Sequence, residues 1–194
     1  MRDNSTADML ASYVDALRPI IYINHFDSRV IDEAISCVSG HAKCVEFNNA
    51  LGAIDFRTKA PMLECDLEGF LKLTMDDGYE NETFLILKDV HEELRNPRVT
   101  ALLKRIAENN LYRDHYSATI FIESEITIIP RELENYITVF DIPLPSTTEI
   151  LDIIHKFIRD IDIFVEEDVV NDIALSFKGL NEFQIGRASC RERV

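Results

Sequence analysis

Short apolar runs alternate with amphipathic segments along the first three quarters of the chain. Five runs of four to six residues predict buried strands, at 19–24, 43–48, 83–87, 118–122 and 137–140. Between most of these runs, apolar residues recur every three to four positions, which predicts helices. Strands this apolar, separated by helices, predict an α/β fold with a parallel open sheet and helices on both faces. The pattern from 49 to 59 is ambiguous.

Residues that favour helix ends lie where the helical spacing begins or stops. Ser5 and Asp8 have capping-box spacing, Asp27 or Ser28 can cap the next helix, and Asp66 precedes another apolar face. Gly40 is placed to end the helix that begins near Ser28, and Pro97 is placed at the first position of a later helix.

The pattern becomes purely helical after Pro145. Ser146 and Glu149 form a second predicted capping box, which opens a helix with one apolar face. A further helix is predicted over 166–177, and residues 181–184 resemble the start of a third. We therefore expect an α/β core over 1–143 and an incomplete helical lid over 144–184. Its apolar positions should be only partly covered: Ile150, Ile154, Phe157, Val169, Ile173 and Phe177.

The last ten residues differ from the rest of the chain. Residues 185–194 (IGRASCRERV) are basic and resemble the translation of a sequencing adapter. We expect this tail to be non-native, and the natural protein to continue beyond Gln184. Deleting the tail should then leave stability unchanged.

The composition restricts the possible partners. A formal net charge of −15 argues against binding to nucleic acid or to an anionic membrane, and no apolar stretch is long enough to span a bilayer. The four cysteines have neither CxxC nor zinc-site spacing, so we expect free thiols in a reducing compartment.

Three segments carry a family resemblance: 18–24 (RPIIYIN), 83–91 (TFLILKDVH) with Asn96-Pro97-Arg98 after it, and 129–145 (IPRELENYITVFDIPLP). Together with the helices after Pro145, they resemble the N-terminal, degenerate ATPase domain of tandem AAA-type ATPases from bacteria and plastid genomes. The resemblance covers roughly residues 8–184. It implies an active, ATP- and magnesium-dependent domain further along the parent protein, and a cytoplasmic or plastid stromal location.

The phosphate-binding loop of such ATPases is absent from this sequence. The loop needs the pattern GxxxxGK[ST], because glycines let backbone N–H groups surround the phosphates and the lysine neutralises them. The residues after the first predicted strand are HFDSR, and none of the six glycines is followed by lysine. We therefore expect no catalytic residue and no bound cofactor in this chain.

Two acidic residues stand where the resemblance places remnants of ATPase motifs. Asp89 follows the strand at 83–87 and matches the magnesium-binding position, but the next residue is Val90, so the catalytic glutamate is missing. Glu123 occupies the position of a neutral polar sensor, where a carboxylate would repel a γ-phosphate. Asp89 is predicted to be a vestigial carboxylate that caps a turn, and Glu123 marks only the sensor-like position.

One alternative uses the same edge of the sheet. Asp27, Asp89 and Glu123 all follow predicted strands, so together they could hold a divalent metal in a receiver-like switch domain. No histidine pairs with Ser or Cys at a recognisable catalytic spacing, and Ser124 lacks the glycines of a hydrolase nucleophile. The preferred interpretation is a non-catalytic ATPase-like module. It would serve assembly, regulation or client contact, with homo-oligomers and the active domain as partners.

Overall fold

The computed structural model describes residues 5–25, 27–76, 82–112, 118–142, 144–180 and 184–185. The chain divides into two compact units, 1–142 and 143–194, which are described separately. No helix in the described part of the chain is long and apolar enough to cross a membrane.

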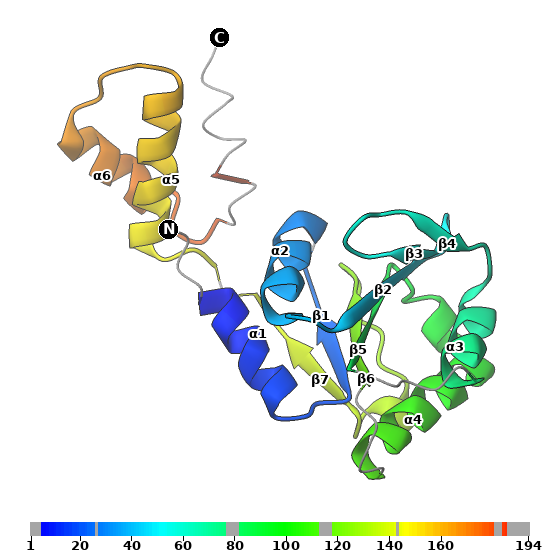
Figure 1. The fold of residues 1–194 in the computed structure, drawn as a ribbon. Coiled ribbons are helices and arrows are strands. Elements are labelled where there is room, and N and C mark those ends of the chain that lie inside the picture. The colour runs from blue at the N-terminus through cyan, green and yellow to red at the C-terminus, as the bar shows by residue number, and fades with distance from the viewer. Residues whose placement is uncertain are drawn as a thin grey trace. The chain divides into compact units, whose positions relative to one another are not determined.

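The first unit is built on one seven-stranded sheet with the order β4-β3-β2-β5-β6-β1-β7 (Figure 1). The strands are β1 (Ile20–Ile23), β2 (Lys43–Asn48), β3 (Gly52–Asp55), β4 (Pro61–Leu63), β5 (Thr83–Lys88), β6 (Ala118–Glu123) and β7 (Ile137–Phe140). Strands β2, β5, β6, β1 and β7 are parallel, as predicted, while β3 and β4 pair antiparallel.

Helices cover both faces of this sheet (Figure 1). They are α1 (Ser5–Asp15), α2 (Ser28–Val38), α3 (Leu67–Asp76) and α4 (Pro97–Tyr112), with short 3-10 turns η1 (Glu93–Arg95) and η2 (Arg131–Leu133). One apolar core joins α3 and α4 to side chains such as Phe47 and Leu87, and a second joins α1 and α2 to Ile21 and Phe84. Successive strand residues point to opposite faces, so both faces of the parallel strands are apolar.

The predicted helix caps largely form. Asp27 accepts a hydrogen bond from the Arg29 backbone N–H at 3.0 Å, and Asp66 accepts one from Gly69 at 2.8 Å. Asn96 accepts one from Arg98 N–H at 3.0 Å, just ahead of Pro97. The side chain of Ser5 lies outside the described residues, so its capping box stays a prediction.

Two strands depart from the predicted bounds in a way that matters for the site. β5 extends to Lys88 and β6 to Glu123, one residue further than the apolar runs indicate. The two residues pair in register at the carboxyl end of the sheet. Both residues are therefore strand positions rather than loop positions.

The second unit contains α5 (Thr147–Asp160) and α6 (Glu167–Ser176). The capping box of Ser146 and Glu149 is present at the start of α5. The buried residues of this unit are Ile150, Ile154, Val170, Ala174 and Ile185. The prediction of partial cover is therefore wrong for Ile150 and Ile154, because α6 and Ile185 close over them.

Other apolar positions of this unit remain accessible. Phe157, Ile173 and Phe177 are half-buried, and Val169 is 45% exposed. Ile185, the first residue of the predicted non-native tail, is fully buried. Its side chain therefore belongs to the packing of this unit, whatever its origin.

Candidate functional site at the carboxyl edge of the sheet

The segment between β1 and α2 crosses the carboxyl edge of the sheet and ends in a helix N-terminus. Helix N-termini attract anions because their first N–H groups are unpaired and the helix dipole is positive there. In this chain Asp27 occupies that position itself: its carboxylate binds the Arg29 N–H and its side chain is only 14% exposed. The imidazole Nδ1 of His25 accepts a hydrogen bond from the Asp27 N–H at 3.0 Å.

A buried lysine lies beside this helix N-terminus. The Lys88 side chain is 10% exposed, and its Nζ is 2.7 Å from the Asp32 carboxylate on α2. Two further carboxylates lie close, that of Glu46 at 3.7 Å and that of Glu123 at 3.5 Å. These three acids hold the pKa of Lys88 above its ordinary value, although burial alone would lower it.

A second lysine completes the cluster, which we name the edge network: Asp32, Glu46, Lys59, Lys88 and Glu123. Lys59 Nζ contacts the Glu46 carboxylate at 2.6 Å and the Asp32 carboxylate at 3.0 Å. It also lies 4.4 Å from the ring centroid of Phe56, within cation–π distance. The edge network thus contains three carboxyl groups and two ammonium groups.

Glu123 is the least well compensated member of the edge network. Its side chain is 4% exposed, and Oε2 makes no hydrogen bond within the described structure. Burial raises the pKa of Glu123, against the lowering effect of a hydrogen bond from Ser28 and of Lys88, while Asp32 raises it further. The protonated form would balance the network at two acids against two lysines.

Asp89 takes no part in the edge network. It is exposed, it has a left-handed backbone with φ of 54°, and its N–H donates to the Glu123 carbonyl at 2.9 Å. Asp27 caps a helix, and Glu123 is buried beside Lys88. The three acids of the predicted metal-binding alternative therefore lie in three different environments: a helix cap, an exposed turn and a buried ion pair. Within the described ranges no group of three or more His, Cys, Asp or Glu residues could hold a metal.

The structure also brings together a histidine and a serine that the sequence did not associate. His91 Nδ1 lies 3.0 Å from Ser124 Oγ, although 33 residues separate them. Ser124 is 1% exposed, and its Oγ also accepts the Ile126 N–H at 3.2 Å. Tyr22 OH donates a hydrogen bond to the Ile126 carbonyl at 2.7 Å, and burial raises the pKa of the Tyr22 hydroxyl. The Ser124 hydroxyl is therefore buried and held by hydrogen bonds, so it is not accessible to a substrate as a nucleophile would be.

Solved structures of two other proteins share this fold. The RuvB Holliday junction branch migration motor of Thermotoga maritima superposes with a TM-score of 0.59 at 13% identity, covering 98% of this chain and 61% of that one. PCH-2 of C. elegans gives a TM-score of 0.58 at 13% identity, over 95% and 61% of the two chains. At this level of identity the likeness concerns the fold alone.

The sequence comparison identifies the family. A family model described as the N-terminal domain of SpoVK-like AAA ATPases matches residues 6–142, and the chain belongs to this family. A curated relative, the uncharacterized AAA domain-containing protein ycf46 of Guillardia theta, is 24% identical over 187 residues. The match covers 87% of this chain but only 33% of the relative, so the chain spans about one third of that protein.

Proposed function

We propose that this domain is a non-catalytic ATPase-like module of a larger AAA protein. In this proposal it serves assembly, regulation or client contact, while ATP and magnesium act at a separate ATPase domain. Membership of an N-terminal AAA domain family supports the proposal, as does the greater length of the curated relative.

The observation that carries the proposal is that the Asp27 carboxylate already occupies the N-terminus of α2, the helix that follows β1. A phosphate placed there would have to displace the carboxylate of Asp27 from the Arg29 N–H. It would also approach the edge network, whose lysines are already paired with Asp32 and Glu46. A phosphate group would be repelled by the nearby carboxylates of Asp27 and of the edge network, and this repulsion is strong where water is excluded. The carboxyl edge of the sheet therefore disfavours a polyphosphate.

The acid that resembles a magnesium ligand gives no support for catalysis. Asp89 is exposed and is followed by the buried Val90, so no carboxylate stands beside it to activate water. We infer that this chain alone does not hydrolyse ATP. In this proposal, ATP hydrolysis belongs to the separate ATPase domain of the larger protein.

Partners and location follow from charge and thiol chemistry. A net charge of −15 disfavours nucleic acid and anionic membranes. The partners that we propose are proteins: an active ATPase domain, further copies of this chain, and protein clients. Cys37, Cys44 and Cys65 are free thiols, consistent with a reducing compartment such as the cytoplasm or plastid stroma.

Calorimetric titration of the full chain with magnesium ATP tests the proposal. We expect no saturable heat and no phosphate release above the level of a protein-free sample. An AAA domain with an intact phosphate-binding loop, titrated under the same conditions, serves as the positive control. A stoichiometric site of micromolar affinity on this chain would overturn the proposal.

A further inference from the structure

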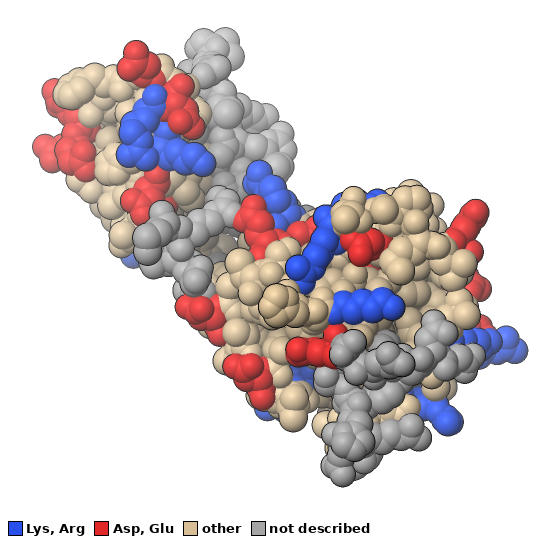
Figure 2. Space-filling view, viewed as in Figure 1, with Lys and Arg blue, Asp and Glu red and all other residues tan. Residues whose placement is uncertain are grey.

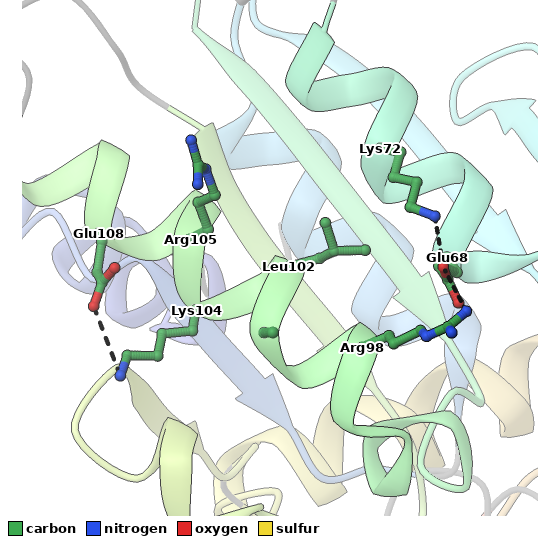
Figure 3. Close-up of a pocket in the computed structure, with 8 residues that line it drawn as sticks. Glu68, Lys72, Arg98, Leu102, Lys104, Arg105 and Glu108 are labelled. Atoms are coloured by element: carbon green, nitrogen blue, oxygen red, sulfur yellow. Dashed lines mark hydrogen bonds and ion pairs between the residues drawn. The ribbon is translucent and has the colours of Figure 1, made fainter.

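A groove between α3 and α4 shares no residue with the edge network (Figure 3). It has a volume of about 650 Å³. Helix α4 lines it with one of its faces, on which Arg98 comes first, Ala101 and Leu102 follow, and Arg105 comes after them. Along the helix, this face therefore presents a cation, two apolar side chains and a second cation.

The spacing on α4 matches the repeat of a helix. Because Arg98 and Arg105 differ by seven positions, they lie on the same side of α4, two turns apart. At 1.5 Å per residue, they are about 10 Å apart along the helix axis. Ala101 is exposed and Leu102 is half-buried, so both can contact a ligand that lies between the two arginines. A strip of this length fits about two turns of a bound helix.

The carboxylates of the groove are already engaged by neighbouring groups. Glu68 pairs with Lys72, one turn away on α3, at 2.5 Å, and its contact with Arg98 is longer at 3.7 Å (Figure 3). Glu108 accepts a hydrogen bond from the Tyr136 hydroxyl at 2.9 Å. A ligand that drew the other cations away would therefore leave neither carboxylate without a partner.

Three cations of the groove remain available to a ligand. Arg98 is 80% exposed, and Lys104 lies 3.8 Å from Glu108, beyond hydrogen-bond distance. Arg105 is exposed and makes no ion pair within the described part of the chain. Guanidinium groups bind carboxylates through two parallel hydrogen bonds. Available cations on a chain of net charge −15 indicate an acidic ligand.

The small size of this cationic surface restricts the ligand further. Acidic side chains are scattered over the visible face of each unit (Figure 2). A long polyanion such as a nucleic acid would extend past the groove and meet acidic surface, whereas a short acidic segment of a protein ends within it. Ala101 and Leu102 also favour a ligand that carries apolar side chains between its acids.

We propose that the α3–α4 groove binds an acidic amphipathic helix of a partner protein. Two acids seven positions apart on that helix pair with Arg98 and Arg105, and two leucines midway between them pack on Ala101 and Leu102. The complementary pattern is ExxLLxxE, which reads the same in both directions and so fits either orientation of the bound helix. This inference rests on the proposed role in protein contact and defines the chemistry of the client or regulator.

Fluorescence anisotropy of a labelled acidic peptide tests the groove in the full chain. The probe is a helical peptide of about sixteen residues with EAALLAAE at its centre. We expect saturable binding with a dissociation constant of about 10–100 μM in about 0.05 M salt, and at least about fivefold weaker binding in about 0.5 M salt. Two matched peptides, one with glutamine for both central glutamates and one with alanine for both leucines, should each bind at least about fivefold more weakly.

A charge-reversed groove variant locates the binding site. Arg98→Glu combined with Arg105→Glu should weaken peptide binding at least about tenfold. Arg18→Glu combined with Lys156→Glu is the matched control, because it gives the same net charge and changes exposed residues that do not line the groove. The control should bind the peptide as wild type does. All four side chains are exposed, so both variants should keep the wild-type circular dichroism.

A peptide of opposite charge identifies the pairing itself. With lysine in place of both central glutamates, the peptide should bind the groove variant at least about fivefold more tightly than the control variant of equal net charge. Equal binding of this peptide to both variants would overturn the assigned pairing. The proposal would also be overturned by acidic-peptide binding that survives in the groove variant, or by a wild-type chain that shows no saturation below about 1 mM.

Two further results separate this proposal from its alternatives. A labelled oligonucleotide of about ten nucleotides that bound more tightly than the acidic peptide, and lost binding in the groove variant, would overturn the proposal in favour of a nucleic-acid site. None of these samples contains ATP. An ATP-binding chain would therefore overturn the proposed function and leave the peptide result unchanged, whereas a groove that binds no peptide would leave the calorimetric result unchanged.

Discussion

At the residue scale, Lys88 is the cation that the edge network depends on. Its 10% exposed side chain reaches Asp32, Glu46 and Glu123. Lys88→Met removes the charge and keeps much of the volume, which leaves three buried or half-buried carboxyl groups with Lys59 alone. Removing one partner from a buried ion pair costs about 3–5 kcal/mol. We expect the free energy of unfolding, measured with urea, to fall by about 3 kcal/mol, because Lys59 still neutralises part of the network.

Lys72→Met provides the matched control for that measurement. Lys72 is 57% exposed and pairs with Glu68 one helical turn away. Exposed pairs of this kind contribute about 0.3–0.5 kcal/mol. If both lysine variants lost the same stability, the edge network would be no more than a surface feature.

Glu123 should make stability depend on pH in a defined direction. Its pKa is raised in the folded chain, chiefly by burial, so the folded state holds this proton more tightly than the unfolded state. The contribution is fully present below the ordinary carboxyl pKa and is lost as the pH rises through the raised pKa. Glu123→Gln, which mimics the protonated form, should therefore be more stable than wild type at neutral pH.

The two proteins should converge as the medium becomes acidic. Urea unfolding of the wild type and of Glu123→Gln between about pH 5 and about pH 8 measures the difference between their free energies of unfolding. The contributions of the other carboxyl groups are the same in both proteins and largely cancel. A Gln variant that is less stable at neutral pH would show that the ion pair with Lys88 outweighs the cost of burying the carboxylate.

The members of the edge network were only partly predictable from the sequence. Glu123 stands out through its place after a predicted strand, but no motif in the sequence marks Asp32, Glu46 and Lys59 as its neighbours. A usable sign was present in β2, where Glu46 lies between the apolar residues Val45 and Phe47 of a strand with both faces buried. A charge at such a position requires a partner. Which partner it finds depends on pairing across the sheet, which one sequence does not contain.

At the element scale, the parallel strands were predictable and the hairpin of β3 and β4 was not. Strands β1, β5 and β6 are almost unbroken apolar runs, because both of their faces are buried. β3 and β4 have four and three residues, and all three residues of β4 are exposed. Gly52 has φ of 71°, and a Cβ there would lie 2.5 Å from the Leu63 carbonyl oxygen. The hairpin therefore depends on the left-handed backbone and the missing Cβ of Gly52, which no apolar pattern reveals.

Ile185, the first residue of the predicted non-native tail, is packed in the core of the helical unit. Ile185 is buried with Ile150, Ile154, Val170 and Ala174, so its loss leaves a cavity among them. Ile185→Ala should destabilise this unit by about 2–3 kcal/mol, as for other large-to-small changes in a core. Deleting only residues 186–194 should leave its thermal unfolding unchanged. A large loss from that shorter deletion would mean that the tail contributes more than Ile185.

At the scale of the whole molecule, the two units have very different cores. The first has apolar clusters on both faces of a seven-stranded sheet, with large side chains such as Tyr22, Phe47 and Phe121 fully buried. Among its described residues, the second has one cluster of five buried side chains. Stability depends on the apolar area removed from water, at about 25 cal/mol per Å², and small cores are marginal. The two units should therefore open with different free energies.

Amide hydrogen exchange on the full chain measures this difference directly. Local opening exposes amides according to the stability of the unit that contains them. We expect the amides of α5 and α6 to exchange much faster than those of β1, β5 and β6, while the sheet stays protected. Repeating the measurement at several protein concentrations separates intrinsic opening from protection by contacts between copies. If α5 and α6 were as well protected as the sheet in a monomeric sample, the five-residue core would be sufficient on its own.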